Sequence, residues 1–425
     1  MAIMLCGEML YRVGTRCSAA RYRLPRCARP LSSGASAGPS TSAAPARKPP
    51  RRVWPILAAG AATAAMAAWG YTAWEHERES VKPEVTRFGT LLLDHVHVLP
   101  EQHGGKFSSD EAPTHRHLRV SAAAPLDVPD EVRAPHSPTD PDSELKHRLS
   151  IYSYYAKEPS LQIERAYTPI GMLSRTEPTM LDFVVKRYAD GEMSRFLHRL
   201  RPGAQVAIRG PVPTWTLPAG KIPDEVVLIV GGTGVTTAHQ LLTNVLDAPS
   251  LAQRTRPRFR VLYAAQTPDS LQLVPELLRL RDEHPDLVQL ALWVEHIQQT
   301  SGTLNSVHTR SLPGTLRPVE GTGSWGSWLR RGLGFAGSPR QWEFIPQSDA
   351  GGTPVAVTRG RIERDDVEHW VGHSGDDATR VLLVCGPDGF IEAVAGPKGR
   401  DQVSQGPLRG ILAGLGYASE QVVKL

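Results

Sequence analysis

Short runs in which apolar and polar residues alternate fill the chain from about residue 85 to residue 212. The runs lie at residues 85–98, 117–122, 148–156, 161–171, 180–188 and 204–212. A period of two residues is typical of strands that bury one face. Only residues 193–200 interrupt them with a helical period. The pattern predicts an antiparallel β-barrel or sandwich over residues 84–222, with residues 123–141, rich in Pro, Asp and Ser, as a loop.

The pattern changes after Pro223 to continuous apolar runs that alternate with helical ones. The apolar runs lie at residues 226–232, 258–265, 287–295 and 380–385, and the helical runs at 237–246 and 271–283. A parallel strand that is covered by helices on both faces needs such a continuous run. Residues 223–425 are therefore predicted to form an α/β Rossmann-like domain with a doubly wound sheet.

One segment of the second half, at about residues 298–358, breaks this alternation. It is rich in Gly, Ser and Pro and carries Trp325, Trp328 and Trp342. So long an irregular insertion in a compact domain is normally either functional or disordered. The composition leaves an ordered lid and a disordered insertion open and slightly favours the disordered one.

The N-terminal residues 1–52 are basic, with Glu8 as their only acid, and are rich in Ser and Ala. This composition is typical of a mitochondrial presequence, and a disordered basic tail is the alternative. The formal net charge of +5 comes largely from this segment, so it does not indicate a nucleic-acid-binding face.

Residues 53–74 contain no charge and carry aromatic side chains near both ends, as a transmembrane helix does. A cleaved sorting segment or a buried helix remains open. Arg51 and Arg52 precede this stretch, and Glu75, Glu77 and Glu79 follow it. The positive-inside rule then predicts a single-pass protein of the mitochondrial inner membrane with its globular part in the intermembrane space.

Two motifs in the first half suggest a flavin dinucleotide site. Arg165, Tyr167 and Thr168 offer a guanidinium for a pyrophosphate, a flat ring and a hydroxyl along one strand. The sequence from Gly191 to Ser194 opens a helix, where free backbone N–H groups can bind phosphate. Either motif alone could equally be an exposed strand face or a capped helix.

Two motifs in the second half suggest a second nucleotide. The glycine-rich run from Gly231 to Thr236 follows a buried strand and opens a helix, which is the context of a dinucleotide-phosphate loop. The turn from Cys385 to Phe390 follows the last buried strand. Cys385 is the only cysteine after Cys27, so neither a disulfide framework nor a cysteine metal site is expected there.

In this order, the four motifs resemble those of the ferredoxin-NADP-reductase superfamily, and within it those of the cytochrome b5 reductase branch. The resemblance covers about residues 86–425 and includes the strand from Val184 to Tyr188. It implies an FAD-containing NAD(P)H-dependent reductase that passes hydride to FAD and then electrons to a haem or a haem protein. The N-terminal arrangement is similar to that of the fungal mitochondrial flavoproteins that support haem attachment to cytochrome c.

The resemblance also assigns expected roles to residues, with no metal ligands among them. Thr168 and Lys186 are expected to act closest to the chemistry. The residues expected to bind FAD are Arg165, Tyr167, Thr168, Val184, Lys186, Met193, Ser194 and Thr236. Those expected on the nicotinamide side are Gly231, Gly232, Thr233, Gly234, Cys385, Gly386 and Pro387.

Some positions depart from the family pattern. Thr237 stands where the family has proline, and Ser270, next to Asp269, stands where an NADH-selective acid is expected, which leaves NADH and NADPH both open. The alternatives to the haem-attachment role are an NADH-cytochrome b5 reductase and an assembly factor that keeps the fold without turnover. The histidines from His95 to His117 could ligate haem or metal, although solvated strand-edge side chains are the more ordinary interpretation.

Overall fold

The computed structural model describes the chain at residues 88–99, 114–122, 141–170, 180–218, 222–251, 256–297, 307–308, 314–319, 340–347, 353–373, 379–401 and 404–425. The expected presequence, 1–52, and the expected span, 53–74, lie outside them. Within the described ranges, no helix is both long and apolar enough to cross a bilayer.

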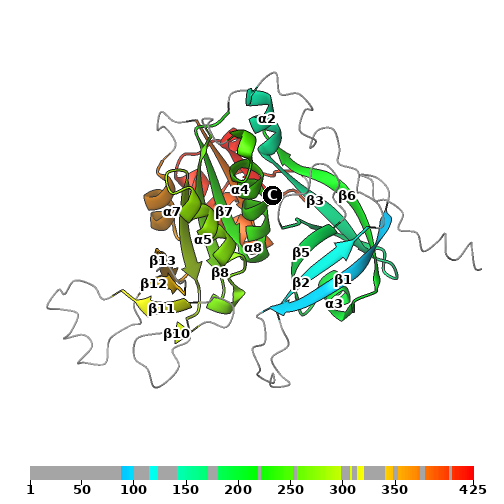
Figure 1. Cartoon of the computed structure of the whole chain (residues 1–425). Coiled ribbons are helices and arrows are strands. Elements are labelled where there is room, and N and C mark those ends of the chain that lie inside the picture. The colour runs from blue at the N-terminus through cyan, green and yellow to red at the C-terminus, as the bar shows by residue number, and fades with distance from the viewer. Residues whose placement is uncertain are drawn as a thin grey trace, which may run out of the picture. The chain divides into compact units, whose positions relative to one another are not determined.

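The first sheet is six-stranded, and its order is β4-β3-β6-β1-β2-β5 (Figure 1). The strands are β1 (Gly89–Leu99), β2 (His115–Ser121), β3 (Ser150–Glu158), β4 (Ile163–Tyr167), β5 (Met180–Lys186) and β6 (Gln205–Thr216). All of their pairings are antiparallel. The antiparallel, barrel-like first half is thereby confirmed. Leu91, Leu93, Phe183 and Ile208 lie in its core, and α3 (Glu192–Arg199) adds Met193.

A short helix, α2 (Pro141–Arg148), precedes β3 and was not predicted, because the expected loop ended at residue 141 and the expected strand began at residue 148. Its residues are strongly polar, so no apolar stripe revealed it. The helix is held by a buried ion pair between Arg148 and Glu144 at 2.8 Å. Arg148 also donates to the carbonyl of Asn244 at 3.0 Å, so a distant helix stabilises this one.

The second sheet is nine-stranded, in the order β10-β11-β12-β13-β9-β8-β7-β14-β15. Its central strands are β7 (Glu225–Gly231), β8 (Arg258–Ala265), β9 (Val288–Val294), β14 (Arg380–Cys385) and β15 (Val422–Lys424), and their pairings are parallel. The helices are α4 (Val235–Leu246), α5 (Val274–Glu283), α7 (Arg364–Val371), α8 (Asp388–Ala395) and α9 (Gly410–Gly414). Every residue of β7 is buried, as expected of a strand between two helical layers.

The expectation of an irregular insertion is wrong for the parts of residues 298–358 that the structure describes. They contribute β10 (Val307–His308), β11 (Gly314–Pro318) and β12 (Gln341–Pro346), and β13 (Val355–Arg359) follows at their end. These strands extend the sheet from the free edge of β9, which offers backbone hydrogen bonds to a short strand. Trp342 is 2% exposed in the core, whereas Trp325 and Trp328 lie outside the described residues.

Helix α4 holds the two sheets together. The side chain of Gln240 accepts from the backbone N–H of Tyr152 at 3.0 Å and donates to the carbonyls of Tyr152 and Pro169 at 3.2 and 3.3 Å. One turn later, Asn244 donates to the carbonyl of Ser150 at 3.3 Å. Because α4 begins at the glycine-rich turn, this helix also fixes that turn against the end of β4.

Candidate functional site

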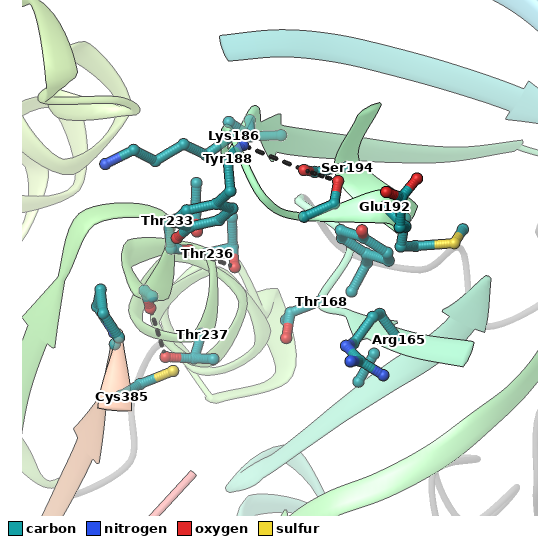
Figure 2. A pocket seen from close by; sticks show the side chains of 18 of the residues that line it. Arg165, Thr168, Lys186, Tyr188, Glu192, Ser194, Thr233, Thr236, Thr237 and Cys385 are labelled. Atoms are coloured by element: carbon teal, nitrogen blue, oxygen red, sulfur yellow. Dashed lines mark hydrogen bonds between the residues drawn. The ribbon is translucent and has the colours of Figure 1, made fainter. Parts of the chain in front are cut away.

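A cavity of about 480 Å³ lies where β4, β5 and α3 face the start of α4 and the end of β14 (Figure 2). The sequence motifs, which are separated by up to 220 residues, meet in its wall. The predicted site residues that line it are Arg165, Tyr167, Thr168, Val184, Lys186, Met193, Ser194, Thr233, Gly234, Thr236, Cys385, Gly386 and Pro387. Gly231 and Gly232 are the predicted residues that are absent from this lining.

The end of β4 supplies a cation, a ring and a hydroxyl, as the sequence predicted. Arg165 is exposed at the cavity, and its guanidinium makes a 2.7 Å bond to the carbonyl of Glu164. The ring of Tyr167 packs edge-on against Phe183 at 6.3 Å. Burial raises the pKa of Tyr167, so its hydroxyl stays protonated and can donate a hydrogen bond.

A chain of hydroxyl groups orients Thr168. Its Oγ1 lies 3.0 Å from the Oγ of Ser153, which in turn accepts from Thr214 at 2.9 Å. Ser153 is buried, so its oxygen has a fixed position behind the cavity wall. The sequence analysis missed Ser153 and Thr214 because they lie on β3 and β6 and reach Thr168 only through sheet pairing.

Lys186 ends β5 at the mouth of the cavity. Its ammonium lies 5.5 Å from the centre of the Tyr188 ring and 3.4 Å from Oε1 of Gln266, which directly follows β8. Partial burial lowers the pKa of Lys186 from its ordinary value. A desolvated cation binds an incoming anion more strongly than a fully hydrated one does.

Tyr188 is a cavity residue that the sequence analysis did not choose. It follows Val184 and Lys186 at every second position, and that period would have pointed to it. It lines the cavity together with Thr233, the threonine of the glycine-rich turn. Burial raises the pKa of Tyr188, so this group is a neutral donor.

The start of α3 presents free backbone groups to the cavity. Ser194, expected to bind phosphate directly, instead donates to the carbonyl of Gly191 at 2.9 Å and accepts from the N–H of Tyr188 at 3.1 Å. No side chain among the described residues caps this helix. The N–H groups of its first turn therefore remain available to an anion. A Cβ at Gly191 would lie 2.7 Å from the Ser194 hydroxyl, so a larger residue there would displace this hydroxyl from its partners.

The glycines of the run from Gly231 to Thr236 have different structural roles. Gly231 ends β7 beneath Phe390, whose ring would lie 3.0 Å from an added Cβ. Gly232 has φ +55°, a left-handed conformation that favours glycine, and it makes the turn. Gly234 lines the cavity, where a Cβ would lie 2.6 Å from the carbonyl oxygen of Cys385. Gly231 and Gly232 thus set the conformation of the turn without lining the cavity.

Cys385 stands at the end of β14, opposite the first turn of α4. Burial raises the pKa of its thiol, so the group stays protonated at neutral pH. Thr236 and Thr237 turn their hydroxyls back to the carbonyls of Thr233 and Gly234, at 3.0 and 2.7 Å (Figure 2). This wall of the cavity therefore carries small groups without charge.

The histidines do not form a metal site within the described part of the chain. His115 is fully buried, and its Nδ1 lies 2.9 Å from the Thr114 hydroxyl. Burial, followed by the charges of Lys186 and His198, lowers its pKa from 6.5 to about 3. His103 and the side chains of His95 and His97 lie outside the described residues.

The cavity residues fit a flavin dinucleotide on one side and a nicotinamide dinucleotide on the other. Arg165, Lys186 and the uncapped α3 supply positive charge and N–H donors for phosphates. The missing Cβ of Gly234 leaves room for a second nucleotide to approach the backbone. An antiparallel barrel and a doubly wound sheet that share such a cavity define the class of two-domain flavoprotein reductases.

Comparison with known proteins agrees with this class. The family model described as "Oxidoreductase FAD-binding domain" matches residues 144–217. The chain is 28% identical over 261 residues to the NADH-cytochrome b5 reductase 2 of Scheffersomyces stipitis, covering 61% of this chain and 66% of that protein. It is 25% identical over 289 residues to the NADH-cytochrome b5 reductase 2 of Saccharomyces cerevisiae, covering 68% and 75%.

Among solved structures, the cytochrome b5 reductase domain of Ulva prolifera nitrate reductase matches with a TM-score of 0.48 and 17% identity. The match covers 81% of this chain and 99% of that one. The match to the S. stipitis relative spans 66% of the length of that protein. The chain is therefore similar to cytochrome b5 reductases, and its residues 144–217 match the FAD-binding domain of oxidoreductases.

Proposed function

We propose that this chain is an FAD-dependent reductase that oxidises NADH and passes the electrons to a haem protein. The observation that carries the proposal is the single cavity in which the motifs of the FAD-binding domain meet the glycine-rich turn and Cys385. Bound FAD would supply the redox chemistry, taking up a hydride from the nicotinamide and releasing electrons to the acceptor.

The residues of the barrel hold the flavin nucleotide in this proposal. Arg165 and the first turn of α3 bind the pyrophosphate, and Tyr167 offers its ring to the flat part of the cofactor. Thr168, fixed by Ser153, presents a hydroxyl of defined direction. Lys186 places its charge where negative charge increases on reduction.

The residues of the second sheet bind and orient the nicotinamide nucleotide. The turn at Gly234 admits its phosphates, and Thr236 and Cys385 form a small neutral wall for the ring. No residue has to move a proton during hydride transfer, so the protein contributes position and exclusion of water.

We propose NADH rather than NADPH as the donor. Asp269 follows β8 and Glu295 follows β9, at the carboxyl ends of the strands where a doubly wound sheet binds the adenosine part. Arg361 is paired with Glu295 at 2.8 Å. Negative charge at this edge repels the extra phosphate of NADPH. The two named relatives are NADH-cytochrome b5 reductases.

The location and the acceptor are further parts of the proposal. We propose that residues 1–52 direct the chain to mitochondria and that residues 53–74 anchor it in the inner membrane, with the catalytic part in the intermembrane space. A role in supplying electrons for haem attachment to cytochrome c is consistent with this location. Cytochrome b5 is the acceptor that the names of the relatives favour.

A visible spectrum of the full chain, purified in detergent, tests the donor half of the proposal. We expect a yellow protein that NADH bleaches anaerobically, with NADPH at least about tenfold less effective by kcat/KM because of the charge at Asp269 and Glu295. A folded preparation that contains no flavin and takes up none contradicts the proposal. Equal use of both donors contradicts the assignment of Asp269 and Glu295.

A second assay identifies the acceptor. The NADH-reduced protein is mixed with cytochrome b5, with free ferric haem or with ferricyanide as an artificial control. Faster reduction of cytochrome b5 than of free haem supports a cytochrome b5 reductase. The opposite order supports the haem-attachment role.

A further inference from the structure

Strand β4, which carries Arg165 and Tyr167 of the cavity wall, lies at an edge of the first sheet. In the part of the chain that the structure describes, it pairs with β3 and with no second strand. Its two middle residues with exposed side chains are Arg165 and Ala166. An edge strand with one neighbour shifts or opens locally more easily than a central strand. The position of β4 therefore depends on side chains that hold it from other strands.

A side chain of β6 reaches this edge strand across β3. Arg209 lies opposite Tyr155 of β3, and Tyr155 lies opposite Ala166 of β4. The Nε and Nη2 groups of Arg209 both donate to Oε2 of Glu164 on β4, at 3.1 and 3.0 Å. Hydrogen bonds between charged groups are stronger than those between neutral ones. The ion pair thus links β4 to a second strand, which the backbone ladder does not do.

Two aromatic rings hold the guanidinium of Arg209 in place. Its central carbon lies 4.1 Å from the centre of the Tyr155 ring and 5.7 Å from the centre of the Phe88 ring. A guanidinium over ring faces at such distances gains cation–π attraction. The side chains of Arg209 and Glu164 are 23% and 34% exposed. Because both are partly buried and one is packed between rings, this pair has a better defined geometry than a fully exposed surface pair.

The ion pair lies on the face of β4 opposite to that of Arg165 and Tyr167, because successive side chains of a strand point to opposite faces. The two faces are connected through one peptide group, since the guanidinium of Arg165 donates to the carbonyl of Glu164 at 2.7 Å. Figure 2 shows Arg165 at the cavity. Neither Arg209 nor Glu164 is among the described residues that line the cavity. Any effect of this pair on a bound cofactor is therefore transmitted through the position of β4.

We propose that Arg209 is a positioning residue, which holds the edge strand β4 through Glu164 so that Arg165 meets the pyrophosphate of FAD. This inference rests on the proposed function, in which the cavity binds FAD. The chain just after β4 is held by a different contact, the 3.0 Å hydrogen bond between Thr168 and Ser153. The segment that carries Arg165 is thus fixed by side chains on both sides of it.

The first readout is hydrogen exchange of the backbone amides of residues 163–167 in the full chain without added flavin, followed by mass spectrometry. Arg209→Met removes the guanidinium and keeps an apolar stem beside the rings, and Glu164→Met removes the other partner at a more exposed position. The control is Arg317→Met. It breaks a pair of similar geometry in the second sheet, where the Nε and Nη2 groups of Arg317 donate to Oε2 of Glu343 at 3.0 and 2.8 Å.

We expect exchange of these amides to become about three- to tenfold faster in Arg209→Met and in Glu164→Met, the effect of one lost hydrogen-bonded contact. The double variant Arg209→Met/Glu164→Met should exchange no faster than either single variant, because both substitutions remove the same contact. Arg317→Met should leave exchange of this segment unchanged. Unchanged exchange in both single variants overturns the inference.

FAD affinity supplies the second readout, by titration of the flavin-free full chain with FAD while flavin fluorescence is recorded. We expect the Kd to rise by about three- to tenfold in Arg209→Met and to stay within about twofold in Arg317→Met. In the Arg165→Met background, Arg209→Met should add less than about twofold, because its effect passes through Arg165. Faster exchange with an unchanged Kd overturns the positioning role, and so does a full additional effect in the Arg165→Met background.

The unmodified chain separates this inference from the proposed function. An unmodified chain that takes up no FAD contradicts the proposed function, and the role of Arg165 and Arg209 in binding FAD falls with it. An unmodified chain that binds FAD, together with an unchanged Kd in Arg209→Met, overturns the inference alone.

Discussion

At the scale of single residues, the chemistry of the site depends on groups whose charge is suppressed by burial. Tyr167 and Cys385 are neutral donors, Lys186 is a partly desolvated cation, and His115 is a buried neutral imidazole. The sequence motifs predicted most of the residues that line the cavity. The burial that sets their protonation could not be predicted from the sequence, because it depends on neighbours from other strands.

His115 makes the stability of the chain depend on pH. Its pKa is lowered to about 3 in the folded chain from an ordinary 6.5, first by burial and then by Lys186 and His198. The imidazole of His115 is therefore protonated near pH 6.5 in the unfolded chain, but only near pH 3 in the folded chain. The stabilising effect is complete above pH 6.5 and is lost as the pH falls, by at most about 1.4 kcal/mol per pH unit for one such group.

Urea unfolding of the full chain between pH 7.5 and pH 4.5 measures this effect, at roughly one-unit steps. We expect His115→Gln to show a smaller loss of stability towards low pH than the unmodified chain. Part of the pH dependence of stability remains in this variant, because the pKa values of His198 and His239 are also lowered. His296→Gln is the control because His296 is 67% exposed. Parallel curves for His115→Gln and the unmodified chain would contradict the assignment.

At the scale of elements, α4 connects the two halves of the site. The sequence predicted the helix and its glycine-rich start, because a buried strand followed by glycines and a helical period is a strong local signal. The side chains by which it binds β3 were not predicted. Gln240 and Asn244 are ordinary helix residues, and nothing in the local sequence indicates that their partners lie about 90 residues earlier.

Gln240→Leu tests this connection. Leucine fills the space, but it leaves the backbone N–H and carbonyl of Tyr152 and the carbonyl of Pro169 without their partner. Each of the three buried backbone groups that lose a partner costs about 1 kcal/mol or more, so we expect a loss of at least about 3 kcal/mol of unfolding free energy. The measurement is thermal and urea unfolding, with the flavin spectrum recorded in parallel.

The control for Gln240→Leu is Gln289→Leu, which changes an exposed glutamine on β9. We expect it to alter the unfolding free energy by less than about 0.5 kcal/mol. If both variants unfold alike, the hydrogen bonds of Gln240 do not hold the sheets together.

At the scale of the whole molecule, the chain combines a catalytic part with a proposed mitochondrial targeting segment and a proposed membrane anchor. Removal of residues 1–79 should release the protein from the membrane fraction and leave its flavin spectrum and its NADH-ferricyanide activity in place. The reason is that all residues of the cavity lie at or after Ile163. Fractionation of cells that express the full and the shortened chain measures the first effect, and assays of both proteins in the same detergent measure the second.

A shortened chain that stays with the membrane would show that residues 1–79 are not the anchor. A shortened chain that is soluble, folded and colourless would separate anchoring from flavin binding in an unexpected way. It would mean that residues 1–79 contribute to flavin binding.

The sequence by itself determined the two sheet types, their order along the chain and most of the cavity lining, because periodicity and glycine-rich motifs are local properties. Tertiary structure alone decided that residues 341–346 pair with the sheet, that Ser194 bonds within the chain and that Tyr188 lines the cavity. The reason is physical: pairing at a sheet edge, burial and the choice of hydrogen-bond partner are set by segments that are distant in sequence and adjacent in space.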